Sequence, residues 1–296
     1  MTADPAPRAV AASLLPGRAL PGAAYTGADL FAWEMEMLWN RAWTPLDRGG
    51  ARHRAHWLGR AWSTTADLPA PATWFGNLGE LLSGYDLPAL TPVETRCDEV
   101  AANWKLIMEN YLECYHCATT HPELSQVQRT RGGEDFVATG NWLGGVLELR
   151  NTARTMSLDG SGPDWSFPGL AEDAVRQVRY HAALPGLFVT AMPDYVVVHR
   201  LEPLTAAATR VVCTWLFHPD LLAACDPGYA VDFWGTTNAQ DYAACESVQR
   251  GVSNRRYVPG PLGTEESALQ RFLEEIGAAY AGTAVARRPA PARAAV

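Results

Sequence analysis

Residues 103–124 read NWKLIMENYLECYHCATTHPEL, and this stretch carries the strongest chemical signal in the chain. His116 and His121 lie five residues apart, and Glu109 and Glu113 precede them. Two imidazoles this close can bind one face of a divalent transition metal. A carboxylate from elsewhere would complete the two-His, one-carboxylate triad that leaves open positions on non-haem Fe(II). The spacing therefore predicts a mononuclear metal site.

The local pattern predicts a helix from Trp104 to about Thr119. Pro122 disfavours the α conformation at the preceding residue, so His121 should lie at the helix end or just beyond it. Residues five apart point about 140° away from each other on an ideal helix. A second histidine beyond the helix end could still converge with the first on one metal.

Composition excludes several classes of protein. The 296 residues are 48% hydrophobic and carry a formal net charge of −8 without a basic run, which excludes nucleic acid as a partner. No apolar run approaches the roughly 20 residues of a membrane span, and the N-terminus lacks the apolar region of a signal peptide. The six cysteines are scattered, which favours reduced thiols in a cytoplasmic protein.

The chain divides into four segments by composition and pattern. Pro/Ala-rich residues 1–25 and 284–296 should be flexible, 26–72 should hold an entry helix and a loop, and 73–283 should form the main domain. We expect Thr26 to cap a helix over 29–43 and the Arg/His-rich stretch DRGGARHRAHWLGR to be a loop.

Periodicity places a sheet between helices. A short helix over 76–86 and a strand over 93–101 precede the histidine motif. Strands are expected near 136–149, 174–182, 186–191, 194–203 and 208–218, followed by helices over 231–251 and 265–280. Helix–sheet–helix order predicts an α+β domain with long helices on one antiparallel sheet.

The residues now carry a resemblance to a known family. NWKLIMENYLECYHCATTHPEL closely resembles the iron-binding helix of the α subunits of Rieske-type non-haem iron (aromatic-ring-hydroxylating) oxygenases. QDYAACESVQRG resembles the helix that gives their third ligand, and LRNTARTMSLDG, DYVVVHRLEP and YVPGPLGTEESALQRF are also similar to their catalytic domain. The likeness covers about 85–280 and 26–43. It implies a helix-grip (START/Bet v 1-like) fold.

The resemblance also implies roles for single residues. His116 and His121 match the imidazole ligands of Fe(2+), and Asp241 matches the carboxylate ligand, with Glu246 as the competing candidate. Glu113 matches the catalytic acid that joins the iron site to a Rieske cluster in the neighbouring subunit of a trimer. A carboxylate hydrogen-bonded to a ligand imidazole also fixes its tautomer.

Other polar residues have plainer interpretations. Glu109 and Asn110 are expected to support the ligands or to pack the motif helix. His181, His199 and His218 are expected to be structural histidines on strands, of which one could reach the pocket. His53 and His56 should be solvated in the Arg-rich loop.

One departure from the family is plain. Its [2Fe–2S] cluster takes ligands from a Cys-x-His pair and a Cys-x-x-His pair. This sequence has one Cys-x-His, Cys114–His116, inside the histidine motif, and no Cys-x-x-His. The chain is therefore expected to bind no [2Fe–2S] cluster. Its electrons could come from a separate Rieske-bearing subunit or a ferredoxin/reductase, or from the substrate. Alternatively, the chain could be a non-catalytic partner of an intact oxygenase.

The resemblance implies a catalytic subunit that uses Fe(II) and O2 as a monooxygenase or dioxygenase. The expected reaction is hydroxylation or oxidative demethylation of a small organic molecule. The ENYLECYHC form is closest to the branch that acts on quaternary ammonium compounds such as glycine betaine. The same resemblance implies a trimer-type homo- or hetero-oligomer.

Overall fold

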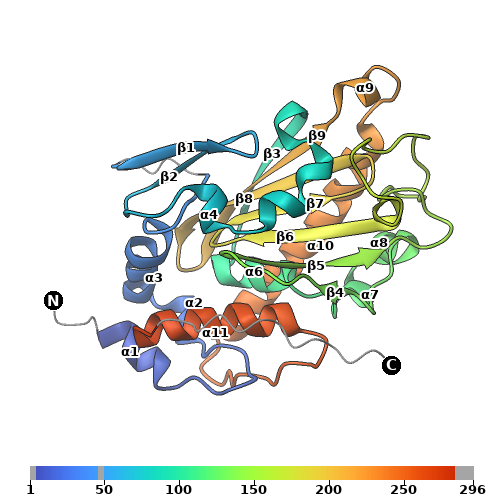
Figure 1. The fold of residues 1–296 in the computed structure, drawn as a ribbon. Coiled ribbons are helices and arrows are strands. Elements are labelled where there is room, and N and C mark those ends of the chain that lie inside the picture. Colours follow the sequence, from blue (N-terminus) through green and yellow to red (C-terminus); the bar gives the residue numbers. More distant parts are fainter. Residues whose placement is uncertain (1–4, 46–49, 284–296) are drawn as a thin grey trace.

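A seven-stranded antiparallel sheet forms the centre of the molecule in the computed structural model, which describes residues 5–45 and 50–283 (Figure 1). The spatial order is β3-β9-β8-β7-β6-β5-β4. The strands are β3 (Thr91–Val100), β4 (Glu134–Asp135), β5 (Trp142–Glu148), β6 (Gln177–Ala183), β7 (Leu187–Ala191), β8 (Tyr195–Thr205) and β9 (Ala208–Phe217). The predicted α+β class, with helices packed on one antiparallel sheet, is confirmed.

Two helices behind the sheet bring the histidine motif and the later acidic segment together. The long helix α10 (Gly228–Val252) packs against α6 (Trp104–Tyr111) and β3, and α6 also contacts β8. The last helix, α11 (Ser267–Ala281), packs against β5. Apolar side chains of α6 and α11, among them Trp104, Met108 and Phe272, are buried in one shared core.

A second core lies on the opposite face of the sheet. It joins β7 and β8 to the short helices α4 (Pro71–Trp74) and α5 (Leu78–Leu81) and to a hairpin of β1 (His53–Trp57) and β2 (Arg60–Thr64). The predicted loop here is wrong. Leu58 and Gly59 both have positive φ, which is the backbone of a tight two-residue hairpin turn. Leucine rarely adopts that conformation, so the turn leaves little trace in the sequence.

The N-terminal segment differs from its prediction. The described part of the expected flexible arm contains α1 (Pro5–Ala11), which packs against α11, and Val10 and Leu20 of this arm are buried. The expected helix over 29–43 is α3 (Ala28–Glu34) followed directly by a π-helical turn (Met35–Trp39), and a short helix, α2 (Ala23–Thr26), precedes it. Thr26 ends α2 and does not cap α3, because Gly27 holds the cap position. The predicted tail 284–296 lies outside the described residues.

The motif helix is broken, contrary to prediction. It ends at Tyr111, and α7 (Cys117–Thr120) and α8 (Pro122–Val127) follow. Glu113 explains the break, because its carboxylate accepts hydrogen bonds from the backbone N–H groups of Tyr115 and His116. Such side-chain bonds give the backbone an alternative to the helix. His121 lies between α7 and α8, as Pro122 predicted.

A disulfide closes the same turn. Cys114 and Cys117 are bonded to each other, whereas Cys97, Cys213, Cys225 and Cys245 are free. The prediction that all six cysteines are reduced thiols is therefore wrong for this pair. Among the described residues, no helix combines the length and apolar character needed to cross a bilayer.

A buried ion pair anchors the motif helix to the N-terminal region. Lys105 Nζ lies 2.6 Å from Glu34 Oε1, and both side chains are fully buried. Trp104 Nε1 donates to Glu34 Oε2 at 2.9 Å, and the Tyr280 hydroxyl also donates to Glu34. The carboxylate therefore joins α3, α6 and α11. A buried ion pair is stable only when such additional hydrogen bonds satisfy it.

Lys105→Met should destabilise the fold, because it leaves the Glu34 charge buried without its partner. We expect a loss of about 3–5 kcal/mol in the free energy of unfolding, measured by urea denaturation. The Glu34→Gln, Lys105→Met double variant should lose less. Arg154→Met, which breaks the exposed pair with Asp164, is the control and should cost below about 1 kcal/mol. Equal losses in both single variants would contradict the anchoring role.

Thiol titration checks the disulfide. Protein isolated and denatured without reductant should show the four free thiols, and six after full reduction. A count of six before reduction would contradict the disulfide.

Candidate metal centre

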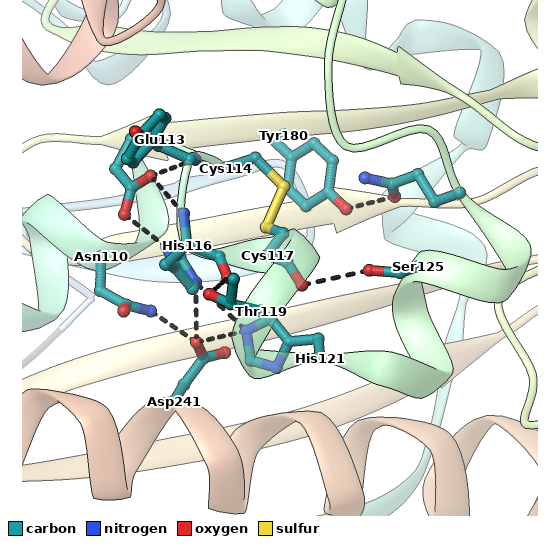
Figure 2. The surroundings of a disulfide bond; sticks show 12 residues. Asn110, Glu113, Cys114, His116, Cys117, Thr119, His121, Ser125, Tyr180 and Asp241 are labelled. Carbon is teal, nitrogen blue, oxygen red and sulfur yellow. Dashed lines mark hydrogen bonds and ion pairs between the residues drawn. A yellow bond between two sulfur atoms is a disulfide. The ribbon is translucent and has the colours of Figure 1, made fainter. Parts of the chain in front are cut away.

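Three candidate ligand atoms from two separate segments of the chain lie close together (Figure 2). His116 lies at the start of α7, His121 between α7 and α8, and Asp241 on α10. The two Nε2 atoms are 3.1 Å apart. Asp241 Oδ1 lies 2.9 Å from Nε2 of His121 and 3.3 Å from Nε2 of His116. The structure thus brings together the three residues that the sequence singled out as ligands.

These separations fit a facial metal site. Divalent first-row metals bind imidazole nitrogen and carboxylate oxygen at about 2.0–2.2 Å. Two ligands at right angles on such a metal are therefore about 3 Å apart, close to the separations observed here. The donor set, two imidazoles and one carboxylate, is that of non-haem Fe(II) enzymes.

Both imidazoles have their other ring nitrogen engaged. His116 Nδ1 is hydrogen-bonded to the Glu113 carboxylate, and His121 Nδ1 lies 2.8 Å from Gln240 Oε1. Asn110 Nδ2 donates to Asp241 Oδ1 at 2.6 Å. Each side chain of the triad therefore has a partner that orients it. Such outer partners fix the tautomer and ring orientation of a ligand imidazole.

Electrostatics inside the cluster are strong. Burial opposes the charge on Asp241, but hydrogen bonds from the imidazoles and Asn110 outweigh it and hold the pKa of its carboxyl at about 2. Burial alone would lower the pKa of His116, whereas the Asp241 and Glu113 carboxylates raise it to about 9. The pKa of His121 is also raised. A proton on the His116 imidazole therefore balances part of the negative charge of the Asp241 and Glu113 carboxylates.

Cys117 is a further donor close to the two histidines. Its Sγ and the imidazole ligand atoms lie within 4.8 Å of one another. However, the thiolate is the ligand form of cysteine, and Cys117 is bonded to Cys114. In this state Asp241 is the third donor.

The structure places the competing acids elsewhere. Glu246, the alternative to Asp241, accepts a hydrogen bond from the backbone N–H of Ala101 at 3.1 Å. Glu109 accepts one from the Tyr25 hydroxyl at 2.9 Å, and burial raises the pKa of its carboxyl to about 8. Neither acid faces the three ligand atoms.

Four other histidines have partners outside the triad. His181 is stacked on Phe136, and burial lowers its pKa to about 3. His218 accepts at Nδ1 from the backbone N–H of Asp220, and His53 pairs with Asp67. His199 Nε2 lies 3.0 Å from Asn238 Oδ1, and His199 also lines the cavity beside the triad.

Gln240 has a role that the sequence reasoning missed. It directly precedes Asp241, so its contact with His121 could have been suspected from the pair QD once Asp241 was placed at the metal. Adjacent helical residues usually point in different directions. The contact depends on how α8 crosses α10, which the sequence does not reveal.

A cavity of about 980 Å³ opens next to the triad. Its wall includes the aromatic residues Tyr111, Tyr180, Phe188 and Trp234. Seven carboxylates line it against two guanidinium groups: Glu113, Glu134, Asp135, Asp241, Glu265, Glu274 and Glu275 against Arg131 and Arg271. The cavity is therefore large enough for a small organic molecule, and its charge favours a cation.

Known proteins are similar to this chain. A glycine betaine monooxygenase oxygenase subunit of Pseudomonas aeruginosa is 29% identical over 244 residues, which cover 72% of this chain and 57% of that protein. A carnitine monooxygenase oxygenase subunit of Acinetobacter pittii is 27% identical over 185 residues, or 62% of this chain and 46% of that protein. The chain thus spans about half the length of these relatives.

Solved structures share the fold. A quaternary ammonium Rieske monooxygenase in complex with an inhibitor superposes with a TM-score of 0.73 at 14% identity, over 92% of this chain and 98% of that chain. Naphthalene 1,2-dioxygenase from Rhodococcus bound to indole gives 0.57 at 14% identity, over 77% and 66%.

The family model of the ring-hydroxylating α subunit, catalytic domain, matches residues 87–282, which include both histidines and Asp241. The chain therefore belongs to the family of ring-hydroxylating α-subunit catalytic domains.

Proposed function

We propose that this chain is a catalytic oxygenase subunit with a mononuclear Fe(II) site formed by His116, His121 and Asp241. The observation that carries the proposal is the meeting of three ligand atoms at separations suited to one metal, each on an oriented side chain. Iron(II) held there would supply O2 activation for the insertion of oxygen into a C–H bond. The protein fixes the ligands and shapes the cavity in which substrate meets them.

The proposed substrate is a quaternary ammonium compound, and the reaction is oxidative N-demethylation. The cavity supports it, because excess carboxylates attract a cation and aromatic faces stabilise a quaternary ammonium group. Two relatives are named for glycine betaine and carnitine. Methyl hydroxylation consumes O2, two electrons and two protons and yields water. The hydroxymethyl group then leaves as formaldehyde with loss of one proton.

The two electrons require a donor, for which we propose a separate Rieske-bearing subunit or a ferredoxin/reductase. Glu113 supports a path to it. Its carboxylate contacts His116 directly, and only 12% of its side chain is exposed. Tyr115, two residues after Glu113 in the same turn, is 69% exposed and offers an apolar contact near this acid. A donor docked on this turn would reach the triad through one side chain and one hydrogen bond, as in a trimer-type assembly.

The rival proposal is a non-catalytic partner subunit. A subunit without turnover has no need of oriented ligands, yet all three donors and their hydrogen-bond partners are present. The intact set is the observation that favours catalysis.

Metal binding should strengthen as pH rises. In the metal-free protein the pKa of His116 is about 9, so below that pH the metal must displace a proton from the imidazole. We expect the dissociation constant for Co(II), a stable substitute for Fe(II), to fall about tenfold per unit between about pH 6.5 and pH 8.5. Competition titration measures it. A dissociation constant independent of pH would contradict protonated ligand imidazoles.

Turnover provides the functional test. Iron-loaded protein, mixed with glycine betaine and with the [2Fe–2S] protein that copurifies from its host after chemical reduction, should release formaldehyde. Asp241→Asn should release none, because it loses a charged ligand at nearly constant volume. Glu113→Gln should slow oxidation of the reduced [2Fe–2S] cluster, which is followed by its visible absorption, while the iron content stays unchanged. Iron-loaded wild type that forms no formaldehyde from this or another methylammonium substrate would contradict the proposed reaction.

A further inference from the structure

A chain of hydrogen bonds supports His121 from the side away from the other ligands. Gln240 Oε1 lies 2.8 Å from His121 Nδ1, and Gln240 Nε2 donates to Glu123 Oε2 at 2.9 Å. Glu123 lies two residues after His121 in the first turn of α8, and Gln240 lies next to Asp241 on α10. These hydrogen bonds thus link the two segments of the protein that carry the ligands.

The chemistry of these groups fixes which group donates in each of these hydrogen bonds. A carboxylate only accepts hydrogen bonds, so it selects the orientation in which the amide NH2 of Gln240 faces Glu123. The amide oxygen must then face His121, and Nδ1 of that imidazole must carry the hydrogen. When a metal replaces the proton on Nε2, the lone pair of that nitrogen would point toward Asp241 and His116, where the metal would lie.

We propose that Glu123 and Gln240 are positioning residues that hold His121 in its metal-binding tautomer and orientation. Gln240 selects the Nδ1–H form, and Glu123 selects the amide orientation that allows Gln240 to do so. The proposal deepens the proposed function, because it assumes that His121 binds a metal.

The two ligand imidazoles are then held in different ways. His116 has a carboxylate partner, Glu113, which adds negative charge and basicity, whereas His121 has a neutral amide. The charge that orients the amide is one residue further out, on Glu123, and half-exposed. Glu113 therefore contacts the His116 imidazole directly, whereas Glu123 is linked to the His121 imidazole through the amide of Gln240.

Exchanging the amide of Gln240 and the carboxylate of Glu123 tests the role of these hydrogen bonds. Gln240→Met removes the amide at similar volume and should weaken Co(II) binding by about 10- to 100-fold. Gln240→Glu alone places two carboxylates against each other, so it should also weaken binding. Adding Glu123→Gln restores a donor and an acceptor in the right order, so the double variant should recover most of the affinity. Asp232 is an exposed acid on the same helix, and adding Asp232→Asn to Gln240→Glu is the matched control for loss of one charge.

The readouts are the Co(II) dissociation constant and the visible absorption of bound Co(II), which reports ligand geometry and does not depend on turnover. Circular dichroism checks that each variant is folded. Binding by Gln240→Met within about twofold of wild type, with an unchanged Co(II) spectrum, would overturn the proposal and leave the metal site standing. A double variant no better than Gln240→Glu would also overturn it. Wild type that binds no Co(II) would defeat the proposed metal site and this inference together.

Discussion

Asp241 is a carboxylate held between two imidazoles, and the rest of the site is organised around that contact. Its Oδ1 lies within 3.3 Å of both Nε2 atoms, and Asn110 holds the same oxygen from α6. Three donors this close would disperse in water without a cation. Here each donor is oriented by a further partner, and the protonated His116 imidazole balances charge on the carboxylate. The fold therefore holds the three donors in a geometry suited to a metal.

The architecture brings together two segments that are far apart in the sequence. The sheet gives α6 and α10 a common surface, so the motif that follows β3 meets the helix that follows β9 (Figure 1). Lys105 and Glu34 anchor the first turn of α6, and the same helix ends at the turn that carries Glu113 and His116. The disulfide and the Glu113 carboxylate shape that turn (Figure 2). The position of His116 thus depends on covalent, ionic and hydrogen-bonding constraints that act on the segment from Lys105 to Cys117.

Much of this could be predicted from the sequence, for identifiable reasons. Alternating β-branched residues indicated the strands, and Pro122 placed His121 at a helix boundary. The candidate ligands came from the match to a known motif, and their role as ligands remains a prediction that their geometry supports. What could not be predicted depends on single contacts. Glu113 breaks the helix through its own side chain, Leu58 adopts an unusual φ, and Gln240 reaches His121 only because of how α8 meets α10. The disulfide between Cys114 and Cys117 lies in the same turn.

The central claim is that these residues form an iron site in a chain with no Cys-x-x-His pair for a cluster of its own. Elemental analysis after anaerobic reconstitution with Fe(II) and removal of loose metal tests it most directly. We expect one iron and no inorganic sulfide per chain in the wild type, and no retained iron in His121→Ala. Wild type that retains no iron, or a His121→Ala variant that retains as much as wild type, would contradict it.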